Sequence, residues 1–160
     1  MVRFLPIIGA LVWAAAANES LQGAPPFAAI VHRSNPVNSV RTADLRAFFS
    51  GAAKSWPEGS KVVLVERDPS SDAARFLFEH ILNTTPREYQ RHLANIEFMG
   101  EEPVKLKILN SDAGACKFVF NVPSAIAVVE AASLVQPECG QVQVLRIDGK
   151  LPGERGYRLQ

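Results

Sequence analysis

Apolar and polar positions alternate with two different periods along the chain, which indicates strands and helices in turn. The clearest example is the stretch from Val62 to Leu82, VVLVERDPSSDAARFLFEHIL. Residues 62–65 form a short β-branched apolar run, typical of a buried strand, and residues 66–71 supply a polar turn. From Asp72 on, the spacing becomes that of a helix. One face of this helix is made by Ala73, Phe76, Leu77, His80 and Ile81. The pattern predicts a strand, a tight turn and a helix, which make half of a βαβ unit.

The same alternation continues over the rest of the chain. Apolar runs and two-residue periods predict further strands over residues 27–32, 104–108, 126–129 and 142–147. Helical periods predict helices over residues 43–50, 86–95 and 111–121. Strands that alternate with helices are typical of an α/β sandwich with a mostly parallel sheet.

Helix starts are marked by residues that cap backbone amides. Thr42 is expected to be the N-cap of the helix over residues 43–50. Thr85, Pro86 and Glu88 form the pattern of a capping box with proline at the first helical position. In the helix that follows, Tyr89, His92 and Leu93 are expected to point inward.

The two ends of the chain differ in character from its middle. Residues 1–17 combine Arg3, an apolar run and the small residues Ala15–Ala17, which is the pattern of a signal peptide; an uncleaved N-terminal anchor is the alternative. Residues 18–26 read as a linker, residues 27–148 as one globular domain, and residues 149–160 as a polar, loosely held tail. The pattern predicts a periplasmic or otherwise exported protein with no stable membrane span once the signal is removed.

Composition narrows the classes of partner and site. The chain has 17 basic and 16 acidic residues without a block of like charge, which argues against a nucleic-acid partner. In an oxidising compartment its two cysteines, Cys116 and Cys139, suggest a disulfide, with two buried free thiols as the alternative. Neither cysteine has histidine or carboxylate neighbours at metal-ligand spacing, so no metal site is expected.

The polar turn before Asp72 is the candidate ligand site. A helix start offers free backbone amides and partial positive charge, and here Arg67, Ser70, Ser71 and Arg75 surround it. These groups suit an oxyanion such as phosphate. The alternative is that Ser71 caps its own helix and the arginines are solvated. Asp72 supports that alternative, because its carboxylate would satisfy the helix start and repel an anion.

Signatures of catalysis are absent from the sequence. It contains no G-x-S-x-G, H-E-x-x-H, Walker or G-x-G-x-x-G pattern. Ser70 and Ser71 have no adjacent base that could activate them for hydrolysis. We therefore expect a protein that is not an enzyme and has no cofactor.

Four segments taken together resemble a known family. They are SNPVNS (34–39), FFSG (48–51) before Trp56, the turn over 63–71, and PSAIAVV (123–129). In this order they resemble the short members of the phosphate-type substrate-binding proteins of ABC transporters. Relatives carry P-G-A-I-G-Y-V at the last segment, so Ala127 and Val128 replace glycine and tyrosine.

The resemblance implies a single-lobe type II periplasmic-binding-protein-like α/β sandwich that binds phosphate or a similar anion for an ABC transporter. By this resemblance Arg67 matches the family's arginine, and Ser70 and Ser71 match its Ser-Gly turn. Asp72 stands where a small or threonine residue donates. Relatives bind the anion between two lobes, whereas this chain has the length of one. The second hypothesis is therefore a periplasmic accessory or protein-interaction domain that keeps the fold and has lost the ligand.

Overall fold

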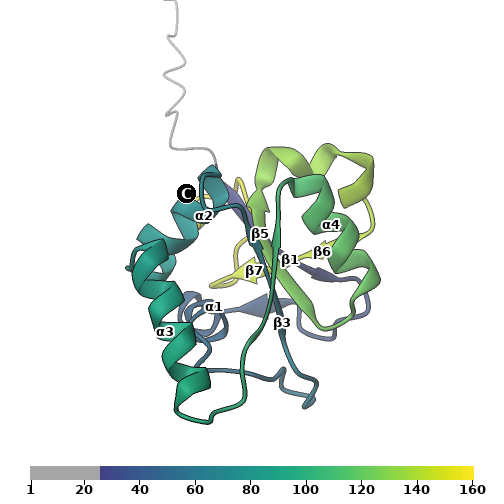
Figure 1. The fold of residues 1–160 in the computed structure, drawn as a ribbon. Helices are drawn as coiled ribbons and strands as arrows, with labels where there is room; N and C mark the ends of the chain where they lie inside the picture. The colour runs from purple at the N-terminus through teal and green to yellow at the C-terminus, as the bar shows by residue number, and fades with distance from the viewer. Residues whose placement is uncertain (1–25) are drawn as a thin grey trace, which may run out of the picture.

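The computed structural model describes residues 26–160, and its centre is a five-stranded sheet (Figure 1). The sheet order is β4-β3-β5-β1-β6, with bounds Lys105–Leu109, Val63–Arg67, Ala125–Glu130, Phe27–His32 and Val142–Val144. β3 is parallel to β4 and β5, whereas β1 is antiparallel to both β5 and β6. Every strand of this sheet except β1 therefore runs in one direction, which confirms the prediction of an α/β fold with a mostly parallel sheet.

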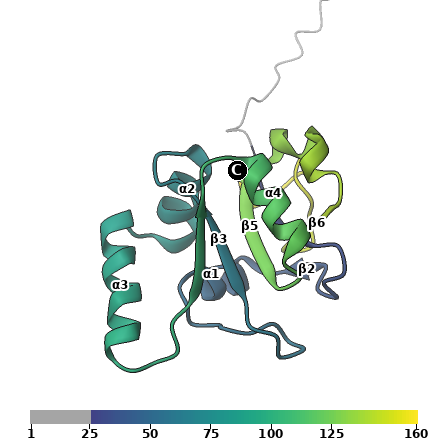
Figure 2. The same ribbon diagram turned by 45° about the vertical axis from the view of Figure 1, so that its right-hand side comes forward.

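Helices cover both faces of this sheet (Figures 1 and 2). One face carries α1 (Thr42–Phe49) and α2 (Asp72–Phe76), which continues as the π-helix η1 (Leu77–Leu82). α3 (Pro86–Phe98) packs outside α2 and η1. The other face carries α4 (Asp112–Asn121), followed after β5 by the short 3₁₀ helices η2 (Ala131–Val135) and η3 (Pro137–Cys139). The sheet is thus the middle of three layers.

Alternation along the strands assigns each side chain to one of two cores. In β1, Ala29 and Val31 face α1 and α2, while Ala28 and Ile30 face α4. Successive side chains of a strand point to opposite faces, so one apolar run can supply both cores. The same rule places Glu66 and Arg67 of β3 on opposite faces, which decides the geometry of the candidate site.

The predicted caps of α1 and α3 have different outcomes in the structure. The Thr85–Glu88 capping box is formed, with the Thr85 hydroxyl accepting from the Glu88 amide at 3.2 Å. Thr42 as an N-cap is wrong: α1 begins at Thr42, and its N-cap is Arg41. The Thr42 hydroxyl instead donates to the Asp148 carboxylate at 2.6 Å, because the turn after β7 (Arg146–Ile147) brings that acid to the helix start.

Two histidines predicted on inward helix faces are exposed. His80 lies in η1, whose wider π-helical turn rotates the side chain away from the face begun in α2. His92 lies in α3, where Tyr89 is the buried residue, and its ring contacts the Ser50 carbonyl at 2.9 Å. Exposure to solvent therefore replaces the burial predicted for both rings.

The C-terminal segment is packed, so the prediction of a loosely held tail is wrong. Tyr157 and Leu159 are buried in the core on the α1 and α2 side. The Leu159 carbonyl accepts a hydrogen bond from the Phe27 amide at 2.7 Å. The predicted strand over residues 142–147 is also divided, because β6 joins the main sheet and β7 pairs with β2 (Ser39–Val40).

The predicted signal peptide and nearly all of the predicted linker lie outside the described residues. Within residues 26–160, no helix combines the length and the apolar character needed to cross a membrane.

Candidate functional site

The carboxyl ends of β3 and β4 meet at one edge of the sheet. Arg67 ends β3 and is paired in register with Leu109, which ends β4. Asp112 follows three residues later as the first residue of α4. Open α/β sheets bind ligands at the carboxyl ends of their strands, so this edge is the expected position of a site.

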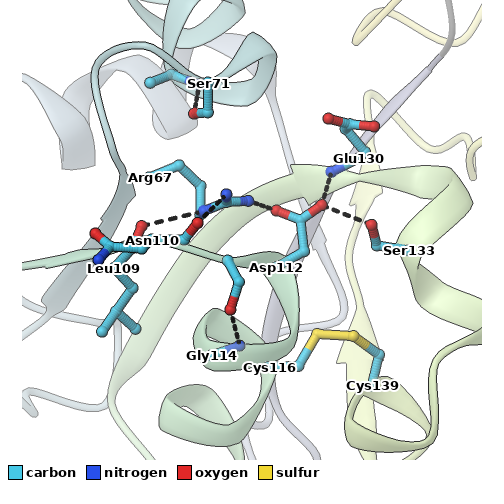
Figure 3. A network of polar contacts seen from close by, with 12 residues as sticks. Arg67, Ser71, Leu109, Asn110, Asp112, Gly114, Cys116, Glu130, Ser133 and Cys139 are labelled. Atoms are coloured by element: carbon cyan, nitrogen blue, oxygen red, sulfur yellow. Dashed lines mark hydrogen bonds and ion pairs between the residues drawn. A yellow bond between two sulfur atoms is a disulfide. The ribbon is translucent and has the colours of Figure 1, made fainter.

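Arg67 and Asp112 form a buried ion pair at this edge (Figure 3). Their side chains are 10% and 7% exposed. The other guanidinium nitrogens donate to backbone carbonyls, Nε to Leu109 at 3.2 Å and Nη2 to Asn110 at 3.0 Å. The chain itself therefore supplies both the counter-charge and the acceptors of the predicted ligand arginine.

The Asp112 carboxylate is held by two further donors. The Ser133 hydroxyl of η2 donates at 2.6 Å, and the backbone amide of Glu130, at the end of β5, donates at 3.2 Å. In Figure 3 the carboxylate lies between the guanidinium and the hydroxyl. A buried carboxylate is stable only when it is paired and hydrogen-bonded, and all three donors serve that purpose here.

Burial lowers the pKa of Arg67, while the nearby charges of Glu130 and Asp68 act in the opposite direction. A guanidinium stays protonated in proteins regardless of such shifts. The site therefore contains a permanent positive charge that needs an anionic partner, and Asp112 provides it.

The other predicted ligand residues also have partners within the chain. The Ser71 hydroxyl is the N-cap of α2 and accepts from the Ala74 amide at 3.2 Å. The Ser70 hydroxyl donates to the Asp68 carboxylate, a contact that lowers the pKa of that acid. Arg75 is exposed and forms an ion pair with Asp72.

The fold separates Arg67 from Arg75. Arg67 lies on the strand face that packs against α4, whereas α2, which carries Arg75, covers the opposite face. Ser70 and Ser71 lie in the loop that crosses between these faces. The structure thus places Arg67 with Asp112 and leaves Ser70, Ser71 and Arg75 around the start of α2.

Sequence reasoning missed Asp112 and Ser133 as members of this site. The sequence pattern places Asp112 only at the beginning of the helix predicted over residues 111–121. Its signal is positional, because Asp112 follows the end of β4 just as Arg67 ends β3, and parallel strands align these ends. Ser133 has no such signal, since its position depends on the course of η2 after β5.

The cysteines at this side of the sheet form a disulfide, Cys116–Cys139. It joins α4 to η3, and both residues are buried. The segment that contributes Ser133 is therefore fastened to the helix that begins with Asp112 (Figure 3).

A second helix start is also occupied by an acid of the chain. The Asp148 carboxylate accepts from the Thr42 hydroxyl at 2.6 Å and from the Thr42 amide at 3.2 Å. The open hollow around it contains four basic side chains, those of Arg41, Arg46, Lys150 and Arg158. At both α1 and α4, a carboxylate of the chain itself lies at the helix start.

Comparison with known proteins identifies solved structures that have a similar fold. No protein-family model matches the chain, and no curated protein matches it in sequence. PstS from Borrelia burgdorferi is similar in structure, with a TM-score of 0.67 and 13% identity over 84% of this chain and 53% of that one. A phosphate ABC transporter substrate-binding protein from Clostridium perfringens, solved with bound phosphate, has a TM-score of 0.62 and 18% identity over 79% and 46%.

A third similar structure is an ABC-type phosphate transport receptor from Vibrio cholerae, with a TM-score of 0.61 and 19% identity over 79% of this chain and 48% of that one. This chain spans about half the length of these proteins. At such identities the similarity concerns the fold. It confirms the predicted resemblance to phosphate-type substrate-binding proteins at that level, and these neighbours are transport binding proteins by name.

Proposed function

We propose that this chain is an exported, non-enzymatic domain that keeps the scaffold of a solute-binding protein and serves the cell envelope as an accessory or protein-interaction domain. The observation that supports this proposal is the Asp112 carboxylate, which pairs with Arg67 and accepts from Ser133 and the Glu130 amide. A free phosphate would have to displace this carboxylate to reach the guanidinium.

The described residues 26–160 form one α/β unit around a single five-stranded sheet, and this architecture supports the same proposal. Binding proteins that capture solutes by hinge closure enclose them between two lobes. A single lobe leaves an anion exposed to water, where the attraction between charges is weak and is screened by salt. Tight capture of phosphate by one copy of this chain is therefore not expected.

Calorimetry tests the proposal. The purified protein, without residues 1–17, would be titrated with phosphate, sulfate and molybdate at concentrations that reveal millimolar binding. We expect no saturable heat with any of the three anions. Saturable heat with one of them would overturn the proposal.

A second candidate function is weak oxyanion recognition at the start of α2 as part of an ABC-type phosphate uptake system. The observations that favour it are the exposed Ser70 and Arg75 and the similarity in fold to a protein solved with bound phosphate. In this case Ser70, Ser71 and Arg75 would bind the anion without Arg67, which is already paired with Asp112. Heat with phosphate that is lost in Ser70→Ala and Arg75→Ala would support this candidate.

A further inference from the structure

The donors around Asp112 come from elements other than its own helix. Arg67 is the last residue of β3, the amide belongs to Glu130, the last residue of β5, and Ser133 lies in η2. An ordinary acid in a first helical turn is stabilised by the free amides of that turn. At α4 the Ser111 hydroxyl fills that role, because it accepts from the Gly114 amide at 3.0 Å. The Asp112 carboxylate is thus bound by donors from three other elements, as a separate ligand in a binding site would be.

These donors are fixed by parts of the fold that do not depend on Asp112. Arg67 also donates to the carbonyls of Leu109 and Asn110, and the Glu130 amide belongs to the central strand β5. η2 is followed by η3, which the Cys116–Cys139 disulfide fastens to α4. Loss of the Asp112 side chain would therefore leave a guanidinium, a hydroxyl and an amide around an empty space.

We propose that Asp112 is an internal ligand that occupies a small carboxylate site, and that the site binds a free carboxylate once this side chain is removed. This inference rests on the proposed function, in which the Asp112 carboxylate takes the place of a free anion beside Arg67. The expected ligands are small carboxylates, because each substitution removes the atoms of one. Asp112→Ala removes one carboxylate group, which formate replaces, and Asp112→Gly also removes the methylene, so that acetate fits the larger space.

The test is chemical rescue of Asp112→Ala, measured as the thermal midpoint in formate and in chloride at equal ionic strength. Removing one partner of a buried ion pair should lower the midpoint by about 10 °C in chloride. Formate at millimolar concentrations should restore part of the loss with saturation, whereas chloride should not. Asp112→Gly should respond more strongly to acetate than Asp112→Ala does.

Two control variants make the result specific. Asp72→Ala removes an exposed acid from the same position in α2, and formate and chloride should affect it equally. Asp112→Ala combined with Ser133→Ala removes one donor, and its response to formate should be several-fold weaker.

An equal response of Asp112→Ala to formate and chloride would overturn the inference, as would an undiminished response of the double variant. If Asp112→Ala does not fold in chloride, its refolding yield is measured instead, and a yield that formate does not raise would also overturn it. Calorimetry of the unmodified protein with phosphate is a separate result. Heat there overturns the proposed function, whereas absence of formate rescue overturns this inference alone.

Discussion

Glu66 of β3 and Tyr89 of α3 lie against each other in the core between the sheet and the outer helix. The Tyr89 hydroxyl donates to the Phe49 carbonyl at 2.8 Å. Glu66 is 2% exposed, and one oxygen of its carboxyl group has no hydrogen-bond partner among the described residues. Burial raises the pKa of Glu66 to about 7, with the nearby Tyr89 hydroxyl acting in the opposite direction. The same burial, together with the Glu66 charge, raises the pKa of Tyr89.

This pKa predicts how stability depends on pH. The folded state keeps the Glu66 proton up to about pH 7, whereas the unfolded chain loses it near pH 4.5. The contribution of Glu66 to stability is thus complete below about pH 4.5 and is lost as the pH rises to about 7. The loss amounts to about 3 kcal/mol at most. Glu66→Gln should raise the free energy of unfolding at pH 8 and flatten its slope between pH 4.5 and 7. Urea unfolding at several pH values measures both effects.

Glu79→Gln is the matched control for this substitution, because Glu79 is exposed. Its pH profile should follow that of the unmodified protein. A Glu66→Gln profile with the same slope would show that Glu66 is charged in the fold at neutral pH.

The two serines before α2 should differ in their effect on stability. Ser71→Ala removes the N-cap acceptor of the Ala74 amide and should cost about 1 kcal/mol. Ser70→Ala removes an exposed hydroxyl that contacts Asp68, and the change should stay within about 0.5 kcal/mol. Thermal unfolding of both variants makes the comparison. Equal effects would contradict the assignment of Ser71 as a cap.

The C-terminal segment should behave as part of the core. Leu159→Ala removes a fully buried side chain and should destabilise the fold by roughly 2–5 kcal/mol. Arg158→Ala is the neighbouring control: its side chain is exposed and lies 3.9 Å from Asp148, and surface ion pairs contribute little. Denaturant unfolding would measure the difference, and similar midpoints for the two variants would refute the packing described for Leu159.

The disulfide should stabilise the side of the sheet that contains Asp112. Replacing both Cys116 and Cys139 by alanine should lower the free energy of unfolding by roughly 3 kcal/mol, because the bridge restricts the unfolded chain. A reductant should destabilise the unmodified protein by a similar amount and leave the double variant unchanged. A double variant that still responds to reductant would show that the effect does not come from this bridge.

Sequence patterns predicted the local features of this fold because local chemistry determines them. The apolar runs of β1 and β5 and the capping box at Thr85 depend on residues a few positions apart. The partner of Arg67 could not be found in this way. The Arg67–Asp112 pair forms because β4 lies parallel to β3. This pairing brings Asp112, which is distant in sequence, to the same edge of the sheet.

The C-terminal segment and α3 show the same limit. The polar composition of residues 149–160 hides two core residues, Tyr157 and Leu159, whose burial requires the completed sheet. In α3 the helical period is correct, but the position of the helix at the outside of the molecule leaves His92 exposed. Periodicity identifies the inward face of a helix and not how much of the molecule lies beneath it.

The hydrogen bond between the Phe27 amide and the Leu159 carbonyl places the first strand and the last residues side by side (Figure 1). A short linker from Gln160 to Pro26 could therefore join them without spanning the molecule. New ends could then be opened in the exposed turn at Gly59, where φ is +97° and an added Cβ would meet no atom within 4 Å. The order of elements in the chain and their arrangement in space are thus separable, so a circular permutant of residues 26–160 should keep both cores.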